Sequence, residues 1–215
     1  MYKYLSYPLT ASMPVYGNHS ESLEITSLKS IENGDSCRVY KIRFENHWGT
    51  HVDCPAHFFL DGKKVTDYLP ETWFFKSPQL IDVTLNAGQL LEQIEGINPD
   101  TDLLLIRTGW SNIRGSKDYS FNNPGLSPEL GIFLRDKFPN IRAIGLDLVS
   151  ISSYTNRELG RLAHKAFLDH DSIGQPILLI EDMFLPLDID SFNEIIVMPL
   201  IVEGIDSAPC TIIGY

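Results

Sequence analysis

A dense group of side chains that can bind a metal ion lies in the segment HWGTHVDCPAHF, residues 47–58. Three of the six histidines and one aspartate of the chain occur there, namely His47, His51, Asp53 and His57. Imidazole nitrogens and carboxylate oxygens are common ligands of zinc and manganese. The types and density of these residues favour a metal centre; the alternative interpretation is a polar, solvated strand end.

The spacing of this group constrains the local backbone. All four positions are odd-numbered, so an extended chain would direct their side chains to one face, and Gly49 and Pro55 disfavour a helix. In a straight strand, however, His47 and His51 would lie about 13 Å apart, too far to share one ion. We therefore expect the chain to curl at Gly49, because glycine permits such a curl. Cys54 is even-numbered and is expected to point away from the ligands in a structural role.

A hydrolytic metal centre needs more ligands than one segment supplies, and His164 and Glu181 are the candidates. His164 lies in a predicted helix but off its apolar stripe, a position that by itself favours a surface histidine. Glu181 ends a hydrophobic strand, where a carboxylate costs free energy unless it is paired, coordinated or in solvent. His19 and His170 lie in loop-like contexts, and we expect them to be exposed.

Alternating strands and helices must position these residues. Near-continuous apolar runs predict buried strands over residues 102–108, 141–147 and 176–182. Helices are predicted over residues 127–138 and 157–168. This alternation indicates an α/β or mixed α+β fold, in which ligands bind at the carboxyl ends of the strands.

Three further features of the elements carry expectations. Ser127 is a plausible helix N-cap before Pro128. The apolar stripe of the second helix is predicted to consist of Leu159, Leu162, Ala163, Ala166 and Phe167. Residues 38–44 alternate in polarity, which predicts a half-buried strand leading towards His47.

Bulk properties narrow the class of protein. The 215 residues fit a single domain, and the net charge of −11 argues against nucleic acid or an anionic membrane as partner. Three scattered cysteines suit a reducing compartment, and we find no signal peptide or stretch long enough to span a bilayer. We therefore expect a soluble cytoplasmic protein. No nucleophile elbow, P-loop or dinucleotide-binding motif is present.

The segment 47–58 resembles the HxGTHxDxPxH signature of the cyclase family of metal-dependent hydrolases, which includes kynurenine formamidases and isatin hydrolases. Every fixed position of that signature is present. The resemblance extends along most of the chain, through the runs LSYPLTASMPVYG, IGLDLVSIS, HKAFL…PILLIED and PLIVEGIDSAP. It implies a swivelling β/β/α fold, a homo-oligomer (dimer or tetramer) and one or two divalent ions, Zn²⁺ or Mn²⁺.

The resemblance also implies roles for individual residues. The first metal would be bound by His47, His51 and Asp53. A second would be bound by Asp53, His164 and Glu181. His57 would be the general acid/base.

Tyr16 stands where formamidases commonly carry a substrate-stacking tryptophan. Asp147 is predicted to accept a hydrogen bond from a ligand histidine and so to orient it, without binding the metal itself. Residues 169–175, DHDSIGQ, form an apparent insertion between His164 and Glu181. The tail after residue 206 also lacks the arginine that often follows the proline in this family. These departures leave the substrate open.

These inferences predict a hydrolase that cleaves an amide, lactam or related carboxylic derivative of a small metabolite. A bound divalent cation would lower the pKa of its water to about 7 and polarise the carbonyl group. The alternatives are a metal-dependent cyclase or dehydratase and a non-catalytic small-molecule-binding protein of the same fold.

Overall fold

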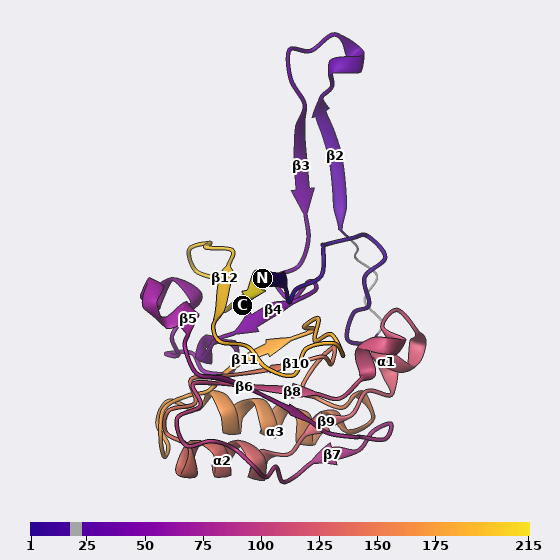
Figure 1. Cartoon of the computed structure of the whole chain (residues 1–215). Coiled ribbons are helices and arrows are strands. Elements are labelled where there is room, and N and C mark those ends of the chain that lie inside the picture. Colours follow the sequence, from indigo (N-terminus) through magenta and orange to yellow (C-terminus); the bar gives the residue numbers. More distant parts are fainter. Residues whose placement is uncertain (18–22) are drawn as a thin grey trace.

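One mixed sheet of nine strands organises the molecule (Figure 1). The computed structural model describes residues 1–17 and 23–215, so the prediction for His19 lies outside the described residues. The strand order is β5-β12-β13-β4-β11-β10-β8-β6, and β1 pairs with β13. The strands are β1 (Lys3–Tyr4), β4 (His51–Asp53), β5 (Phe74–Phe75), β6 (Pro78–Asp82), β8 (Leu103–Arg107), β10 (Ala143–Leu146), β11 (Leu178–Glu181), β12 (Ile195–Pro199) and β13 (Ser207–Gly214).

Strands β6, β8, β10 and β11 run parallel, and all residues of β8, β10 and β11 are buried. Leu103 and Leu105 of β8 belong to one hydrophobic core, whereas Leu104 and Ile106 belong to the other. Covering both faces explains why these strands are apolar without alternation. The three predicted buried strands and the mixed α/β class are confirmed.

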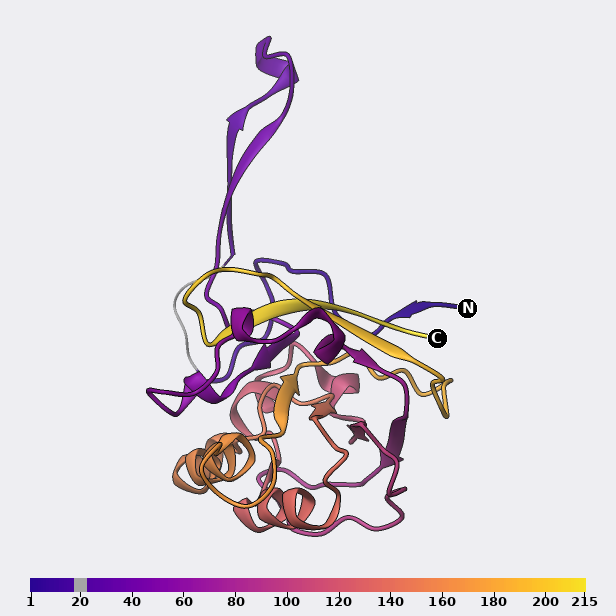
Figure 2. The same ribbon diagram turned by 90° about the vertical axis from the view of Figure 1, so that its left-hand side faces the viewer.

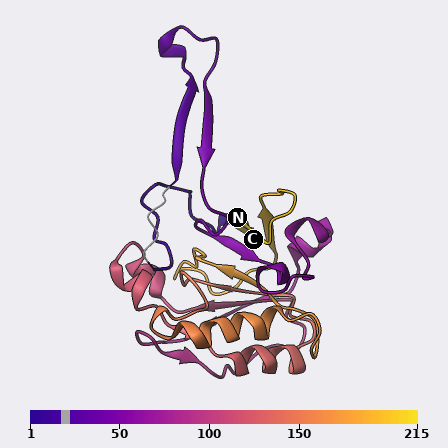
Figure 3. The same cartoon turned by 180° about the vertical axis from the view of Figure 1, so that it is seen from behind.

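Two helices cover one face of this parallel half, as Figures 1 and 3 show. They are α2 (Pro128–Lys137) and α3 (Arg157–Leu168), and a shorter helix, α1, spans Lys117–Phe121. Ser127 caps α2 as predicted, because its hydroxyl accepts a hydrogen bond from the Leu130 amide at 3.2 Å. The other face is covered by the antiparallel strands, which wrap over it in Figure 2.

The buried face of α3 differs from the predicted stripe. Leu162 is 49% exposed, while Gly160 and His164 are buried. The buried set is displaced by one residue, which is a rotation of about 100° about the helix axis. Close packing on the segment 150–153 explains the rotation, because a Cβ atom at Gly160 would lie 2.2 Å from the Ser152 hydroxyl.

The strands β2 (Glu24–Lys29) and β3 (Val39–Arg43) form a hairpin that projects away from the sheet (Figures 1 and 2). The strand predicted within residues 38–44 is confirmed as β3, but its expected half-burial is wrong, because every residue of both strands is exposed. The polarity alternates as a buried strand requires, but every residue of the hairpin strands is exposed, so no other element within residues 1–17 and 23–215 covers either face.

The remaining elements are short. They are the paired strands β7 (Leu90–Leu91) and β9 (Gly125–Leu126) and the 3-10 helices η1 (Ile31–Asn33), η2 (Pro55–His57), η3 (Val65–Asp67), η4 (Pro70–Trp73), η5 (Trp110–Ile113) and η6 (Tyr154–Asn156). In the described part of the chain, no helix has the length and apolarity needed to cross a bilayer.

Candidate metal centre

Strand β4 lies between β11 and β13 and carries His51 and Asp53 into the middle of the sheet. His51 lies directly opposite Glu181 of β11. The predicted curl before β4 is confirmed, since Gly49 has φ +68° and a Cβ atom there would lie 2.4 Å from the Met13 methyl group. The curl brings His47 back over the strand, with its ring centroid 5.0 Å from that of His51.

Four buried side chains from three elements converge at this point, and we call them the floor: His51, Asp53, His164 and Glu181. The Nε2 atom of His51 lies 3.6 Å from Asp53 Oδ1 and 3.5 Å from Glu181 Oε2. The Nε2 atom of His164 lies 3.4 Å from Glu181 Oε1 and 3.9 Å from Asp53 Oδ2.

These separations match ligands that share one ion. Charge-assisted hydrogen bonds between nitrogen and oxygen are about 2.7–2.9 Å long, so 3.4–3.9 Å is too long for direct bonds. Two ligands at about 2.1 Å from a tetrahedral cation lie about 3.4 Å apart. The floor therefore has the dimensions of a coordination shell.

The hydrogen bonding of the floor leads to the same conclusion. His51 Nε2 and both oxygens of Asp53 are buried without any hydrogen-bond partner among the described residues. Orphaned buried polar atoms cost free energy and are rare in native proteins. A divalent cation would satisfy all three atoms at once, so these residues fit a metal ion.

The electrostatics of the floor favour an added positive charge. Burial alone would lower the pKa of His51, but Asp53 and Glu181 outweigh it and raise the pKa to about 9. Burial would likewise raise the pKa of Glu181, but its contacts with His164 and His51 lower it to about 2. The two carboxylates thus attract a cation, and a metal ion competes with the proton for the same histidine nitrogen.

Backbone groups orient the floor side chains. Nδ1 of His51 lies 2.7 Å from the Gly49 carbonyl oxygen, and Nδ1 of His164 lies 2.9 Å from that of Gly160. Each Nδ1–H therefore donates to a carbonyl, which leaves Nε2 as the ligand atom. Glu181 Oε1 accepts from the hydroxyl of Ser150 at 3.0 Å and from the amide of Ile151 at 2.8 Å.

Asp147 does not orient a ligand histidine, contrary to the prediction. Its carboxylate accepts hydrogen bonds from the Thr108 amide and hydroxyl, the Gly109 amide and the Ser111 hydroxyl. Asp147 lies at the end of β10 next to β8, so its side chain stabilises the turn that follows β8. Backbone carbonyls perform the role that we had assigned to it.

Three partly exposed side chains lie above the floor, and we call them the rim: His47, His57 and Asp206. His47 Nδ1 lies 3.2 Å from Asp53 Oδ1, and its ring centroid is 4.4 Å from that of His57. His57 Nδ1 lies 2.8 Å from Asp206 Oδ2, the length of a direct hydrogen bond. Burial would lower the pKa of His57, but the bond to Asp206 and the nearby carboxylates raise it.

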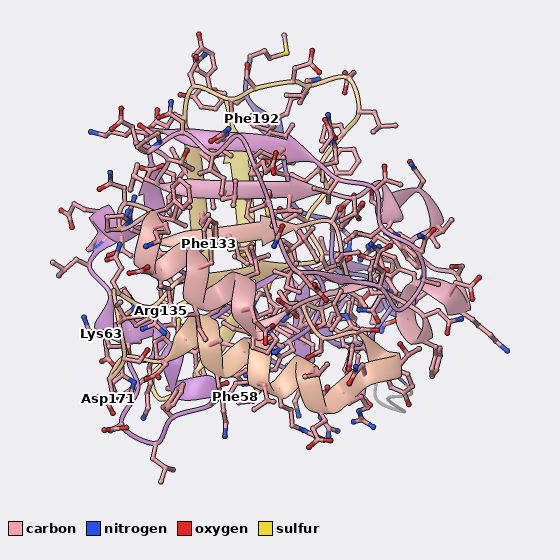
Figure 4. The ribbon with its side chains drawn as sticks, turned by 90° about the horizontal axis from the view of Figure 1, so that it is seen from below. Phe58, Lys63, Phe133, Arg135, Asp171 and Phe192 are labelled. Carbon is pink, nitrogen blue, oxygen red and sulfur yellow. The ribbon has the colours of Figure 1, made fainter. Side chains whose placement is uncertain are left out.

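The floor and rim open into a cavity of about 260 Å³. Pro14, Val15 and Tyr16 form part of its wall, and the Tyr16 hydroxyl donates to the Ser153 carbonyl at 3.4 Å. Phe58, labelled in Figure 4, also lines the cavity and stacks on the His164 imidazole with centroids 5.0 Å apart. Cys54 is fully buried in the hydrophobic core, in keeping with a structural role.

Several residues of the site were not found from the sequence. Asp206 is separated from His57 by 149 positions, and its only signal was its place in the family-like run near the C-terminus. Asp182 follows Glu181 with φ +52° and is held by two hydrogen bonds from the Arg114 guanidinium, at 2.8 and 2.6 Å. No spacing in the sequence links Asp182 to Arg114.

Comparisons with known proteins agree with this architecture. The model of the family described as "Putative cyclase" matches residues 4–153. Kynurenine formamidase of Bacillus mycoides (strain KBAB4) is 30% identical over 207 residues, covering 95% of this chain and 92% of that protein. Kynurenine formamidase of Bacillus anthracis is also 30% identical over the same coverage.

Solved structures share the fold. Isatin hydrolase A from Labrenzia aggregata, bound to benzyl benzoate, superposes with a TM-score of 0.82 at 21% identity, covering 100% of this chain and 93% of that chain. Isatin hydrolase A from Ralstonia solanacearum gives a TM-score of 0.77 at 20% identity, covering 100% and 91%. Fold and centre together define an α/β protein with a candidate divalent-metal site. The chain belongs to the cyclase family, as the signature in residues 47–58 predicted.

Proposed function

We propose that the protein is a metal-dependent hydrolase that cleaves the C–N bond of a small amide or lactam, similar to a kynurenine formamidase. The observation that carries this proposal is the floor, whose orphaned buried ligand atoms face a cavity beside a histidine that is free to exchange protons. Relatives named kynurenine formamidase, at 30% identity over almost the whole chain, support the same reaction class.

The floor and His47 would hold one or two divalent ions, zinc or manganese. His47, His51 and Asp53 would bind the first ion, and Asp53, His164 and Glu181 the second. When bound, such an ion supplies an activated water and polarises the substrate carbonyl. Nitrogen and carboxylate ligands suit both metals.

His57 carries protons between water and the leaving nitrogen. Its Nδ1–H donates to Asp206, so Nε2 is the atom that accepts and returns a proton. Asp206 fixes the tautomer and orientation of the ring, and its negative charge stabilises the protonated form. The contact is direct at 2.8 Å, which distinguishes His57 from the widely spaced floor residues.

The cavity wall favours a substrate with both an apolar and an anionic part. Tyr16 and Phe58 offer aromatic surface, and Arg157 and Arg161 of α3 bring two guanidinium groups to the same cavity. Among the described residues, neither arginine forms an ion pair with a carboxylate, although the chain carries a net charge of −11. Arginine is well suited to bind a substrate carboxylate.

The projecting hairpin supports a homo-oligomer, dimer or tetramer. Ile25, Leu28, Tyr40 and Ile42 are each more than half exposed on β2 and β3. An isolated two-stranded hairpin with apolar side chains is marginally stable in water and marks an interaction surface. Multi-angle light scattering of the wild type should give a molar mass of two or four times 24.3 kDa. A molar mass equal to that of one chain would contradict this proposal.

We also propose that the protein works in the cytoplasm on a small-molecule substrate, without nucleic acid or membrane as partner. The three cysteines are unpaired, as a reducing compartment requires. The acidic net charge is unsuited to phosphate backbones or anionic lipids.

The hydrolase is tested by metal analysis together with a substrate screen. Protein stripped by a chelator and reloaded with zinc or manganese is assayed on formyl-amides, lactams and lactones, with Glu181→Gln as the matched variant. Glu181→Gln keeps the shape of the side chain but removes its charge, so we expect metal binding and turnover to fall together. Absence of any bound transition metal, with no activity gained from either ion, would contradict the proposal.

A further inference from the structure

A second group of metal-ligating side chains lies outside the cavity, where the loop after His57 meets the end of α3. It consists of Asp61, His170 and Asp171, whose ligand atoms lie within 4.8 Å of one another. His170 and Asp171 belong to the apparent insertion 169–175, which the catalytic centre does not use. We propose that these three residues bind a divalent transition-metal cation, such as Zn²⁺, at a site separate from the floor.

The distances have the same character as those of the floor. His170 Nε2 lies 3.4 Å from Asp61 Oδ1 and 3.8 Å from Asp171 Oδ1. Both separations exceed the length of a direct hydrogen bond and suit two ligands of one cation, at about 3.4 Å for tetrahedral geometry. One imidazole nitrogen and two carboxylate oxygens are a ligand set that zinc accepts.

Orphaned atoms provide independent support. In residues 1–17 and 23–215, buried side-chain nitrogens and oxygens without a hydrogen-bond partner occur in two places. One is the floor, at His51 and Asp53, and the other is His170, where both ring nitrogens are buried and unpartnered. His170 is therefore not the exposed loop histidine that we expected, because only 23% of its side chain is exposed.

Among the described residues, the two carboxylates, 80% and 81% exposed, have His170 as their cationic neighbour. Within the described part of the chain, neither Asp61 nor Asp171 forms an ion pair with a lysine or an arginine. Lys63 lies on the same flank as Asp171 (Figure 4), but its ammonium lies over the Tyr68 ring, 5.5 Å from the centroid. Two carboxylates therefore share a single imidazole, an arrangement that a divalent cation would neutralise.

The inserted loop is anchored by a buried arginine side chain. The buried Arg135 guanidinium donates hydrogen bonds to the carbonyl groups of Ala166, Asp169, Gly174 and Gln175. Anchoring by four carbonyls fixes the ends of the loop that presents His170 and Asp171, and Figure 4 shows Arg135 and Asp171 on the same flank of the molecule. A fixed loop lowers the entropy cost of coordination.

Asp61, the carboxylate that faces His170 from the other loop, also lies in a tight turn. A Cβ atom at Gly62 would lie 2.5 Å from the Pro55 backbone, so the turn after Asp61 is pressed against η2. Phe59 packs edge-on against the His170 ring, with centroids 5.4 Å apart. A cation here would tie the segment that follows His57 to the end of α3, and thereby brace two of the elements that carry the catalytic centre.

Counting zinc tests the proposal. Wild type, His170→Ala and Asp61→Asn are stripped, equilibrated with ZnCl₂ by dialysis and measured for zinc per chain. We expect the wild type to bind one zinc more than either variant. Asp100→Asn, at another exposed aspartate that is not part of the group, is the matched control and should bind as the wild type does.

Stability gives a second measurement of the same site. Zinc should raise the melting temperature of wild type and Asp100→Asn more than that of Asp61→Asn, because the ion stabilises only the folded loops. Equal zinc counts in wild type, Asp61→Asn and Asp171→Asn would overturn the proposal, even if His170→Ala failed to fold. The count does not depend on activity, so the site could fail while the hydrolase stands, or the reverse.

Discussion

The floor and the rim of the cavity contain the same residue types but differ in burial and spacing. Side chains of the floor are 1 to 7% exposed, whereas those of the rim are 27 to 32% exposed. Histidine and carboxylate atoms lie 3.4–3.9 Å apart in the floor, but 2.8 Å apart in the His57–Asp206 pair of the rim. The long buried contacts suit a shared metal ion, and the short exposed contact suits a proton.

The difference shows how one histidine-rich segment divides its roles. β4 pairs on both sides, so His51 and Asp53 are fixed within the sheet. His57 lies four residues beyond Asp53, in the 3-10 helix η2 that begins at Pro55, where the chain leaves the sheet and reaches the cavity mouth. A rigid site suits a ligand, and a partly exposed site suits a group that must exchange protons with water.

The largest effect on metal content and turnover should come from removing a side chain of the floor. His51→Ala removes a ligand and leaves the buried carboxylates of Asp53 and Glu181 with one fewer neighbour that can carry positive charge. We expect loss of bound metal and a fall in kcat by several orders of magnitude. Elemental analysis and steady-state kinetics on the same preparation measure both. Normal metal content in this variant would mean that the floor is not the ligand set.

Removing His57 from the rim should affect turnover without affecting metal. His57→Ala should keep its metal and fold, while kcat falls by about 10²–10⁴-fold, the usual contribution of a general acid or base. His47, Asp53 and His57 also offer ligand atoms within 4.8 Å of one another, so the variant is informative. Metal loss equal to that of His51→Ala would make His57 a ligand and erase the distinction between floor and rim.

A smaller effect is expected from the partner of His57. Asp206→Asn keeps the shape of the side chain but removes the charge that fixes the Nδ1–H tautomer. We expect kcat to fall by about 10- to 100-fold, as for the carboxylates that orient metal-ligating histidines, with metal content unchanged. Ser207→Ala is the control, because Ser207 also donates to Asp206 Oδ2, at 3.0 Å, but does not touch the imidazole. Equal losses in the two variants would show that Asp206 is merely structural.

Local patterns predicted much of the fold. The apolar runs of β8, β10 and β11 and the capped start of α2 were readable because each depends on residues next to one another. The curl at Gly49 could be predicted because His47 and His51 would lie too far apart in a straight strand to share one ion. The exposure of β3 could not be predicted, because alternation shows that a face is apolar but not whether this chain supplies its cover.

The residues of the site also differ in whether local sequence patterns could predict them. Its signature segment is local, whereas the pairing of His57 with Asp206 and of Asp182 with Arg114 depends on tertiary contacts over 149 and 68 positions. The role given to Asp147 failed for the same reason, since its neighbours come from β8 and the turn after it. The burial of His164 required the rotation of α3, which Gly160 and Ser152 set together.

The smallest expected change is in KM, and it tests whether the wall of the cavity selects the substrate. Arg157, Arg161 and His164 follow one another at spacings of four and three residues, so one face of α3 presents them to the cavity. Arg161→Ala should raise KM for a carboxylate-bearing amide by about 10-fold, the usual loss for one charged hydrogen bond, with kcat nearly unchanged. For a neutral amide of the same size, KM should hardly change. Arg38→Ala, on the distant hairpin, controls for the loss of one positive charge. Equal changes of KM for the two substrates would mean that Arg161 shapes the wall but does not recognise charge.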